Sequence, residues 1–168
     1  MGYVCLIAGE YQEAVHWCSR ALEYDKHDVY SLANLGASLS GVGKHEEART
    51  VLQQALEISP NHPPALYSMG TLLLFTGFLS EALKYLEKAV AFNPNYTEAW
   101  NHLGIALLIS GQPGSRECFE NALRANVTNQ SAVMNLAMAI QCETSCSTND
   151  AVKKQSILSI EFDSKSIT

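Results

Sequence analysis

The sequence predicts an all-α protein, a solenoid of antiparallel helix pairs, and three observations predict it. Glycines recur at a constant spacing of 34, alanines follow the first three of them by 12 and by 19, and each unit holds two amphipathic segments of helical length divided by a short turn. The glycines are Gly2, Gly36, Gly70 and Gly104. A fixed period in this range is the signature of a repeat array.

The first two units occupy about residues 1–28 and 29–62. The first is truncated, because Met1 stands where the seventh residue of a unit belongs, and we expect only half of its first helix. In the second unit, small residues such as Gly36 and Ala48 allow two helices to approach closely. A turn at 41–43 divides these helices, and Ser59-Pro60 ends the second, since the residue before proline avoids the α region.

The remaining units are expected at residues 63–96, 97–129 and 130–141. The third turns at 76–78 and closes at Asn93-Pro94. The fourth keeps Trp100 and Gly104 but then fits the pattern only if one residue is missing near 112–114. The fifth is partial. Residues 142–168 leave the pattern and are expected to form a divergent tail or a weak capping helix.

Two stretches carry a resemblance to a known family. The best first half of a unit is Trp100-Asn101-His102-Leu103-Gly104, and the best second half is Ala82–Ala89, closed by Pro94. This pattern resembles the tetratricopeptide repeat family over roughly residues 2–140. The resemblance implies a right-handed superhelix, with the first helix of each pair lining a concave groove that binds other proteins.

Composition and charge exclude several classes of function. The 168 residues are 47% apolar and 17% charged, as in folded proteins. The net charge of −6 is unfavourable for binding a phosphate backbone, so no nucleic acid partner is expected. The sequence contains no run of about 18 apolar residues, so membrane insertion is not expected. Five scattered cysteines, an odd number, favour a reducing compartment, and we expect a cytoplasmic protein.

Catalytic and metal-binding constellations are not evident in the sequence. It has no glycine-rich phosphate loop, no Gly-x-Ser-x-Gly turn and no His-x-x-x-His pair. Cys142 and Cys146 are four residues apart, but no second pair completes a ligand set. We therefore expect no enzyme, no cofactor and no metal.

The groove that the resemblance implies is almost uncharged. Its fifth and ninth positions in each unit hold no Lys or Arg, so it lacks the cations with which one subtype of the family holds a chaperone's C-terminal carboxylate. Asparagine side chains offer one acceptor and two donors, which match a peptide backbone. The candidate peptide-binding residues are Asn34, Tyr67, Asn101, His102 and Asn135. The alternative is that the asparagines are repeat consensus residues facing water.

The sequence therefore predicts a non-enzymatic scaffold that binds a peptide or helix of a partner protein. A second interpretation makes the chain the repeat portion of a larger enzyme or assembly, for example a glycosyltransferase. It is motivated by the half-missing first unit and by Asn-x-Ser/Thr sites such as Asn126-Val127-Thr128. A third is self-association, because the truncated unit leaves the apolar segment Val4–Ile7 without a full partner helix.

Overall fold

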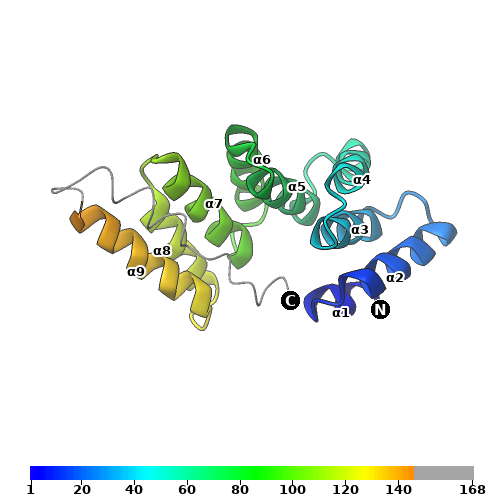
Figure 1. Cartoon of the computed structure of the whole chain (residues 1–168), viewed down its shortest axis with the longest axis horizontal. Helices are drawn as coiled ribbons and strands as arrows, with labels where there is room; N and C mark the ends of the chain where they lie inside the picture. Colours follow the sequence, from blue (N-terminus) through cyan, green and yellow to red (C-terminus); the bar gives the residue numbers. More distant parts are fainter. Residues whose placement is uncertain (146–168) are drawn as a thin grey trace. The chain divides into compact units, whose positions relative to one another are not determined.

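The computed structural model describes residues 1–145, and all regular secondary structure in that range is helical (Figure 1). The helices are α1 (Gly2–Ile7), α2 (Tyr11–Tyr24), α3 (Val29–Gly41), α4 (His45–Ile58), α5 (Pro63–Phe75), α6 (Leu79–Phe92), α7 (Thr97–Ser110), α8 (Ser115–Ala125) and α9 (Gln130–Ser145). The all-α solenoid of helix pairs is thereby confirmed. Most of the predicted tail at 142–168 lies outside the described residues.

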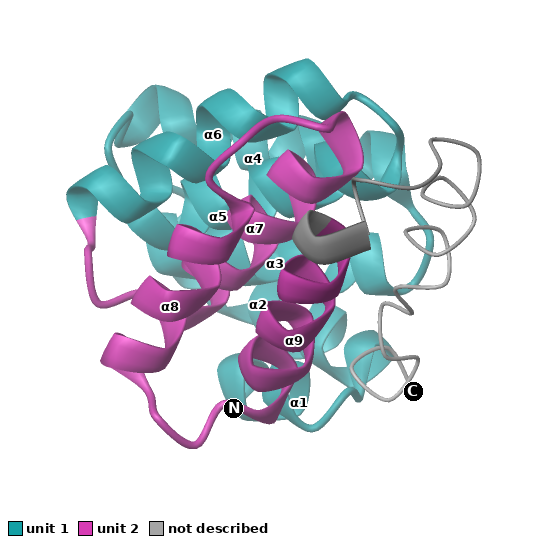
Figure 2. Cartoon of the chain, turned by 90° about the vertical axis from the view of Figure 1, so that its left-hand side faces the viewer, with its two compact units in different colours: residues 1–92, 167–168 teal, residues 93–166 magenta. Residues whose placement is uncertain are grey.

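The chain divides into two compact units after Phe92 (Figure 2). The first unit holds α1–α6 and the second begins at Asn93 and holds α7–α9. Within the first, α3 packs against α1, α2, α4 and α5, and α5 packs against α6. Within the second, α9 packs against both α7 and α8. Each consecutive pair is joined by a short turn, so its helices run in opposite directions.

Close helix approach at the repeat glycines sets the spacing within each pair. A methyl group added at Gly36 would lie 2.4 Å from Leu52 Cγ, so only hydrogen fits there. The same relation recurs in every described pair: Gly2 faces Cys18, Gly70 faces Leu86 and Gly104 faces Phe119. The four facing side chains are buried, three of them completely. Burying a Leu or Phe side chain stabilises the fold by about 1.5–3 kcal/mol, so this repeated contact forms the centre of each pair's core.

A second set of glycines makes the turns between paired helices. Gly9, Gly43, Gly77 and Gly111 share the spacing of 34, and all have positive φ. At Gly43 and Gly77 a Cβ would meet no atom within 4 Å, so space does not require glycine there. Their φ values of +82° and +86° require glycine instead, because a residue with a side chain is strained in the left-handed region.

Local signals also place the helix ends. α4 ends at Ile58 and α6 at Phe92, each two residues before Pro60 or Pro94. α3 begins after Asp28, whose carboxylate accepts hydrogen bonds from the backbone N–H groups of Tyr30 and Ser31. These bonds satisfy two of the amide groups that a helix N-terminus leaves unpaired.

The fourth pair is shorter than the others. Phe119 follows Gly104 by 15, whereas Leu52 follows Gly36 by 16, which agrees with the expected loss of one residue. The connecting segment 111–114 is one residue longer than the equivalent 42–44, so the loss falls at the start of α8, which begins at Ser115, four residues before Phe119, whereas α4 begins seven before Leu52. Helix α8 therefore lacks about one N-terminal turn, while its packing contact with α7 is retained.

Candidate functional site

Two of the predicted site residues, Asn34 and Tyr67, lie in the first unit. Asn34 is on α3 and Tyr67 on α5, and both side chains are half-buried. Because α3 and α5 pack against each other, these residues belong to neighbouring first helices. Leu74, which the sequence suggests as a companion of Tyr67 in an anchor pocket, is 7% exposed and belongs to the core.

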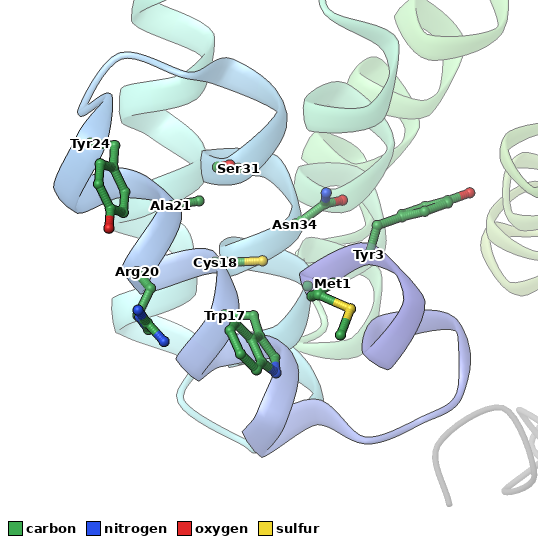
Figure 3. A pocket seen from close by; sticks show the side chains of 10 residues that line it. Met1, Tyr3, Trp17, Cys18, Arg20, Ala21, Tyr24, Ser31 and Asn34 are labelled. Carbon is green, nitrogen blue, oxygen red and sulfur yellow. The ribbon is translucent and has the colours of Figure 1, made fainter.

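An open pocket of ≈ 410 Å³ lies beside Asn34, at the N-terminal end of α1 (Figure 3). Its walls come from three helices and are mainly apolar and aromatic. They comprise Met1, Gly2 and Tyr3 from the α1 end, Trp17, Cys18, Arg20, Ala21 and Tyr24 from α2, and Ser31 and Asn34 from α3. The Arg20 guanidinium lies 5.4 Å from the centre of the Trp17 ring, which places a cation at the rim. The volume falls in the range of about 300–1,000 Å³ that is usual for ligand sites.

The other three predicted residues lie in the second unit. There the side-chain amide of Asn135 on α9 donates a hydrogen bond of 3.0 Å to Asn101 Oδ1 on α7. Asn101 is only 7% exposed, so this bond satisfies a nearly buried acceptor. Two of the asparagines that were expected to bind a peptide thus bind each other. Sequence reasoning missed this pair, although the two residues are one repeat period apart.

His102, beside Asn101, is oriented by its own helix. Its Nδ1 lies 2.9 Å from the Glu98 carbonyl oxygen, and a carbonyl can only accept, so Nδ1 carries the proton of the neutral ring. Burial lowers the pKa of His102, and the hydrogen bond to Glu98 and the Glu98 charge oppose this effect. The hydrogen bond therefore fixes the orientation of the imidazole on α7, with Nδ1–H directed at Glu98.

A buried histidine beside α3 and α5 was not predicted from the sequence. The ring of His62, which precedes α5, meets the ring of Tyr30 edge-on at 4.5 Å between centroids. Among the described residues, neither ring nitrogen of His62 has a hydrogen-bond partner, and neither does Thr71 Oγ1. Burial lowers the pKa of His62, and the Asp28 charge opposes this. No sequence motif marks this histidine.

One cluster of possible metal ligands occurs in the described residues. The ligand atoms of Cys5, Glu10 and Glu13 lie within 4.8 Å of one another. Both carboxylates are exposed, and three donors fall short of the four that a structural zinc site uses. In the same part of the chain, no helix has both the length and the apolar character to cross a membrane.

Comparison with family models identifies the repeat. Two models described as tetratricopeptide repeat match residues 1–61 and 39–103, and together they span residues 1–103. The chain belongs to the tetratricopeptide repeat (TPR) family. The comparison with curated proteins finds no match.

Solved TPR structures share this fold. MamA 41-end from Desulfovibrio magneticus RS-1 is 25% identical, with 95% of this chain and 90% of that one covered and a TM-score of 0.66. YrrB, described as a TPR protein with an unusual peptide-binding site, is 21% identical over 99% and 86%, with a TM-score of 0.64. The first TPR of Spaghetti (RPAP3), bound to the HSP90 peptide SRMEEVD, is 21% identical over 71% and 96%, with a TM-score of 0.66.

Proposed function

We propose that this TPR chain is a non-enzymatic protein-interaction scaffold that binds an uncharged peptide or helical segment of a partner protein. The observation that carries the proposal is the near absence of charged residues from α3, α5 and α7, which are the first helices of their pairs. Neither α3 nor α5 contains a charged residue, and α7 contains only Glu98, yet each presents polar or aromatic side chains at half-buried positions. Such surfaces favour hydrogen bonds to a peptide backbone and apolar contacts over ion pairs.

In the first unit the proposed contacts are Asn34 and Tyr67. In the second unit they are His102 and Asn135, with Asn101 holding Asn135 in position through the 3.0 Å hydrogen bond. Two TPR structures described with a peptide-binding site or a bound peptide, YrrB and RPAP3, support a binding role for the fold. Cys5, Cys18 and Cys142 carry free thiols, which supports the proposed cytoplasmic location.

A selection from a displayed peptide library tests this proposal. The full chain is compared with Asn34→Ala/Tyr67→Ala in the first unit and His102→Ala/Asn135→Ala in the second. The matched control is Gln53→Ala/Lys88→Ala, two exposed residues on the second helices α4 and α6. We expect peptides that are enriched by the native chain and the control but not by one of the site variants. Equal enrichment by all four proteins would refute a site on the first helices.

The absence of cations on the first helices gives a second, independent test. The acidic peptide SRMEEVD, which accompanies RPAP3, is expected not to bind this chain, because α3, α5 and α7 offer no Lys or Arg to its carboxylates. Binding of this peptide with micromolar affinity would contradict the uncharged-ligand proposal.

Self-association is a second candidate role, favoured by the exposure of α1. Tyr3, Val4 and Ile7 are all more than half exposed, which leaves an apolar surface on a six-residue helix. Sedimentation equilibrium of the native chain and of Val4→Ser/Ile7→Ser measures it. A concentration-dependent mass in the native chain alone supports the proposal, and a monomer at high concentration refutes it.

A further inference from the structure

The groove between the second helices α2 and α4 contains an open pocket that the proposed peptide surface does not use. Its volume is ≈ 360 Å³, and its floor is formed by the apolar side chains of Leu35 and Leu39 on α3. Val15 on α2 and Val51 on α4 line the walls, and Lys44, the residue before α4, lines the pocket with a half-exposed side chain. The pocket therefore combines an apolar interior with a nearby cation.

The next groove along the repeat, between α4 and α6, shows how the same place can be filled. Arg49 stands 34 residues after Val15 and therefore takes its place. The Arg49 guanidinium carbon lies 5.6 Å from the centre of the Phe78 ring, and its Nη2 lies 3.6 Å from Glu81 Oε2. Because Phe78 and Glu81 lie at the start of α6, the Arg49 side chain spans the groove from α4.

The exposure of the two floors differs accordingly. In the groove that Arg49 spans, the floor residues Met69 and Leu73 are only 2% and 1% exposed. Their equivalents Leu35 and Leu39 are 9% and 5% exposed. Valine is too short to span a groove as arginine does, so part of the apolar floor between α2 and α4 stays accessible.

The charges beside this floor decide which side chain fits the pocket. Lys44 stands 34 residues before Phe78, so the pocket has a cation where the next groove has a ring. Glu47 takes the place of Glu81, and Lys44 Nζ lies 3.0 Å from its Oε1, so this carboxylate already has a cation. An incoming arginine or lysine would meet a like charge. An aromatic ring would not, because its negative face attracts an ammonium group.

We propose that the pocket between α2 and α4 binds an aromatic side chain that a partner protein presents on its surface. The ring lies on Leu35 and Leu39, in the place that the Arg49 side chain takes in the next groove, and its face meets the Lys44 ammonium. The contact reverses that of Arg49 with Phe78, because here the chain supplies the cation and the partner supplies the ring. An aromatic anchor in a pocket is a usual centre of a protein interface.

The probe is N-acetyl-L-tryptophanamide, titrated into the ¹⁵N-labelled full chain and followed by the amide chemical shifts. We expect saturable shifts at Val15, Ser19 and Val51, which line the pocket, with a dissociation constant of about 1–10 mM for a ligand of this size. N-acetyl-L-leucinamide is apolar but has no ring face. It is expected to bind at least about threefold more weakly.

Replacing the cation tests the contact with the ring. Lys44→Gln is expected to weaken binding of the tryptophan amide by about two- to fivefold, which is the effect of a cation–π contact at an exposed site, and to leave binding of the leucine amide unchanged. The matched control is Lys88→Gln, an exposed lysine on α6 that does not line the pocket. This control is expected to leave the binding of both amides unchanged.

A second variant closes the pocket with the chain's own solution. Val15→Arg/Lys44→Phe copies the pair formed by Arg49 and Phe78 into the groove between α2 and α4. It is expected to abolish binding of the tryptophan amide and to raise the thermal midpoint. Lys44→Gln changes one exposed side chain, so it keeps the test valid if this double variant folds poorly.

Selection from a displayed peptide library tests that the ring comes from a protein. We expect peptides with an aromatic residue that are still enriched by Asn34→Ala/Tyr67→Ala but not by Val15→Arg/Lys44→Phe. Because Asn34 and Tyr67 do not line this pocket, loss of the proposed peptide surface leaves these peptides enriched. Binding of the tryptophan amide without any such peptide would overturn the assignment to a protein partner.

Four further outcomes would overturn the proposal. The first two are no shifts at these amides up to about 20 mM probe and equal affinity for the tryptophan and leucine amides. The third is unchanged binding by the folded Val15→Arg/Lys44→Phe variant. The fourth is a native dimer that this variant converts to a monomer, since a second copy of the chain would then be the occupant.

Discussion

The contact between Gly36 and Leu52 can be tested by Gly36→Ala. Its effect on the free energy of unfolding should change sign when Leu52 is also replaced by alanine. In Gly36→Ala the new methyl group would lie 2.4 Å from Leu52 Cγ and 2.7 Å from Cδ2. Cγ is the branch point of a fully buried side chain, so it cannot turn aside. Overpacking a core costs about 1–3 kcal/mol, and the 2.4 Å contact with a fixed branch point places this change at about 2–3 kcal/mol. Alanine recovers about 1 kcal/mol as a better helix former. We therefore expect a net loss of about 1–2 kcal/mol in the free energy of unfolding.

The partner variant removes the obstruction. Leu52→Ala alone is expected to cost about 2–5 kcal/mol through the cavity it leaves. In that background the atoms nearest to the new methyl group, Leu52 Cγ, Cδ2 and Cδ1, are gone. Gly36→Ala is then expected to stabilise the chain, by up to about 1 kcal/mol, because only its helix propensity remains. The double-mutant cycle measures the coupling directly.

Urea unfolding followed by circular dichroism is the assay. With a slope of about 2 kcal/mol per molar urea, Gly36→Ala is expected to lower the midpoint by roughly 0.5–1 M. The reasoning fails if Gly36→Ala is neutral or stabilising in the native background, or if it remains destabilising by the same amount in the Leu52→Ala background.

Three further predictions concern other features. Gly77→Ala is expected to lower stability by about 1–2 kcal/mol through its φ of +86° alone, since no atom lies within 4 Å of the new Cβ; an unchanged thermal midpoint would refute backbone strain there. Asn101→Ala and Asn135→Ala are expected to couple by about 0.5–1.5 kcal/mol in a double-mutant cycle, and additive losses would show that the 3.0 Å hydrogen bond does not form in solution. The pKa of His62 is lowered in the folded chain, so its neutral form stabilises the fold above the unfolded value of about 6.5, and this stability is lost as the pH falls through the lower folded value. The urea midpoint of His62→Phe should thus fall less between pH 7 and pH 5 than that of the native chain, and an equal fall would contradict the assignment.

The sequence predicted the helix pairs and their packing register because both depend on side-chain volume at fixed spacing. A glycine that recurs at a constant interval, with a large apolar residue 16 later, indicates close helix contact without any structure. The one-residue shift in the fourth unit was visible for the same reason, since Phe119 keeps its contact with Gly104.

The candidate site was harder to predict, because polar contacts depend on direction and on what lies opposite. Composition and spacing do not show that Asn135 donates to Asn101, or that the ring nitrogens of His62 are buried beside Tyr30.

The shortened fourth pair shows where this fold accommodates changes of length. The segment 111–114 between α7 and α8 is one residue longer than the equivalent 42–44, and α8 has lost about one N-terminal turn, yet Gly104 and Phe119 still meet. The residues from Gly111 to Gly114 are exposed, and two of them are glycines with positive φ. Exposed loop tips of this kind tolerate insertions. This turn is therefore the place at which to insert an epitope tag or a fluorescent reporter, because the packing of the adjoining helices does not depend on the length of the turn.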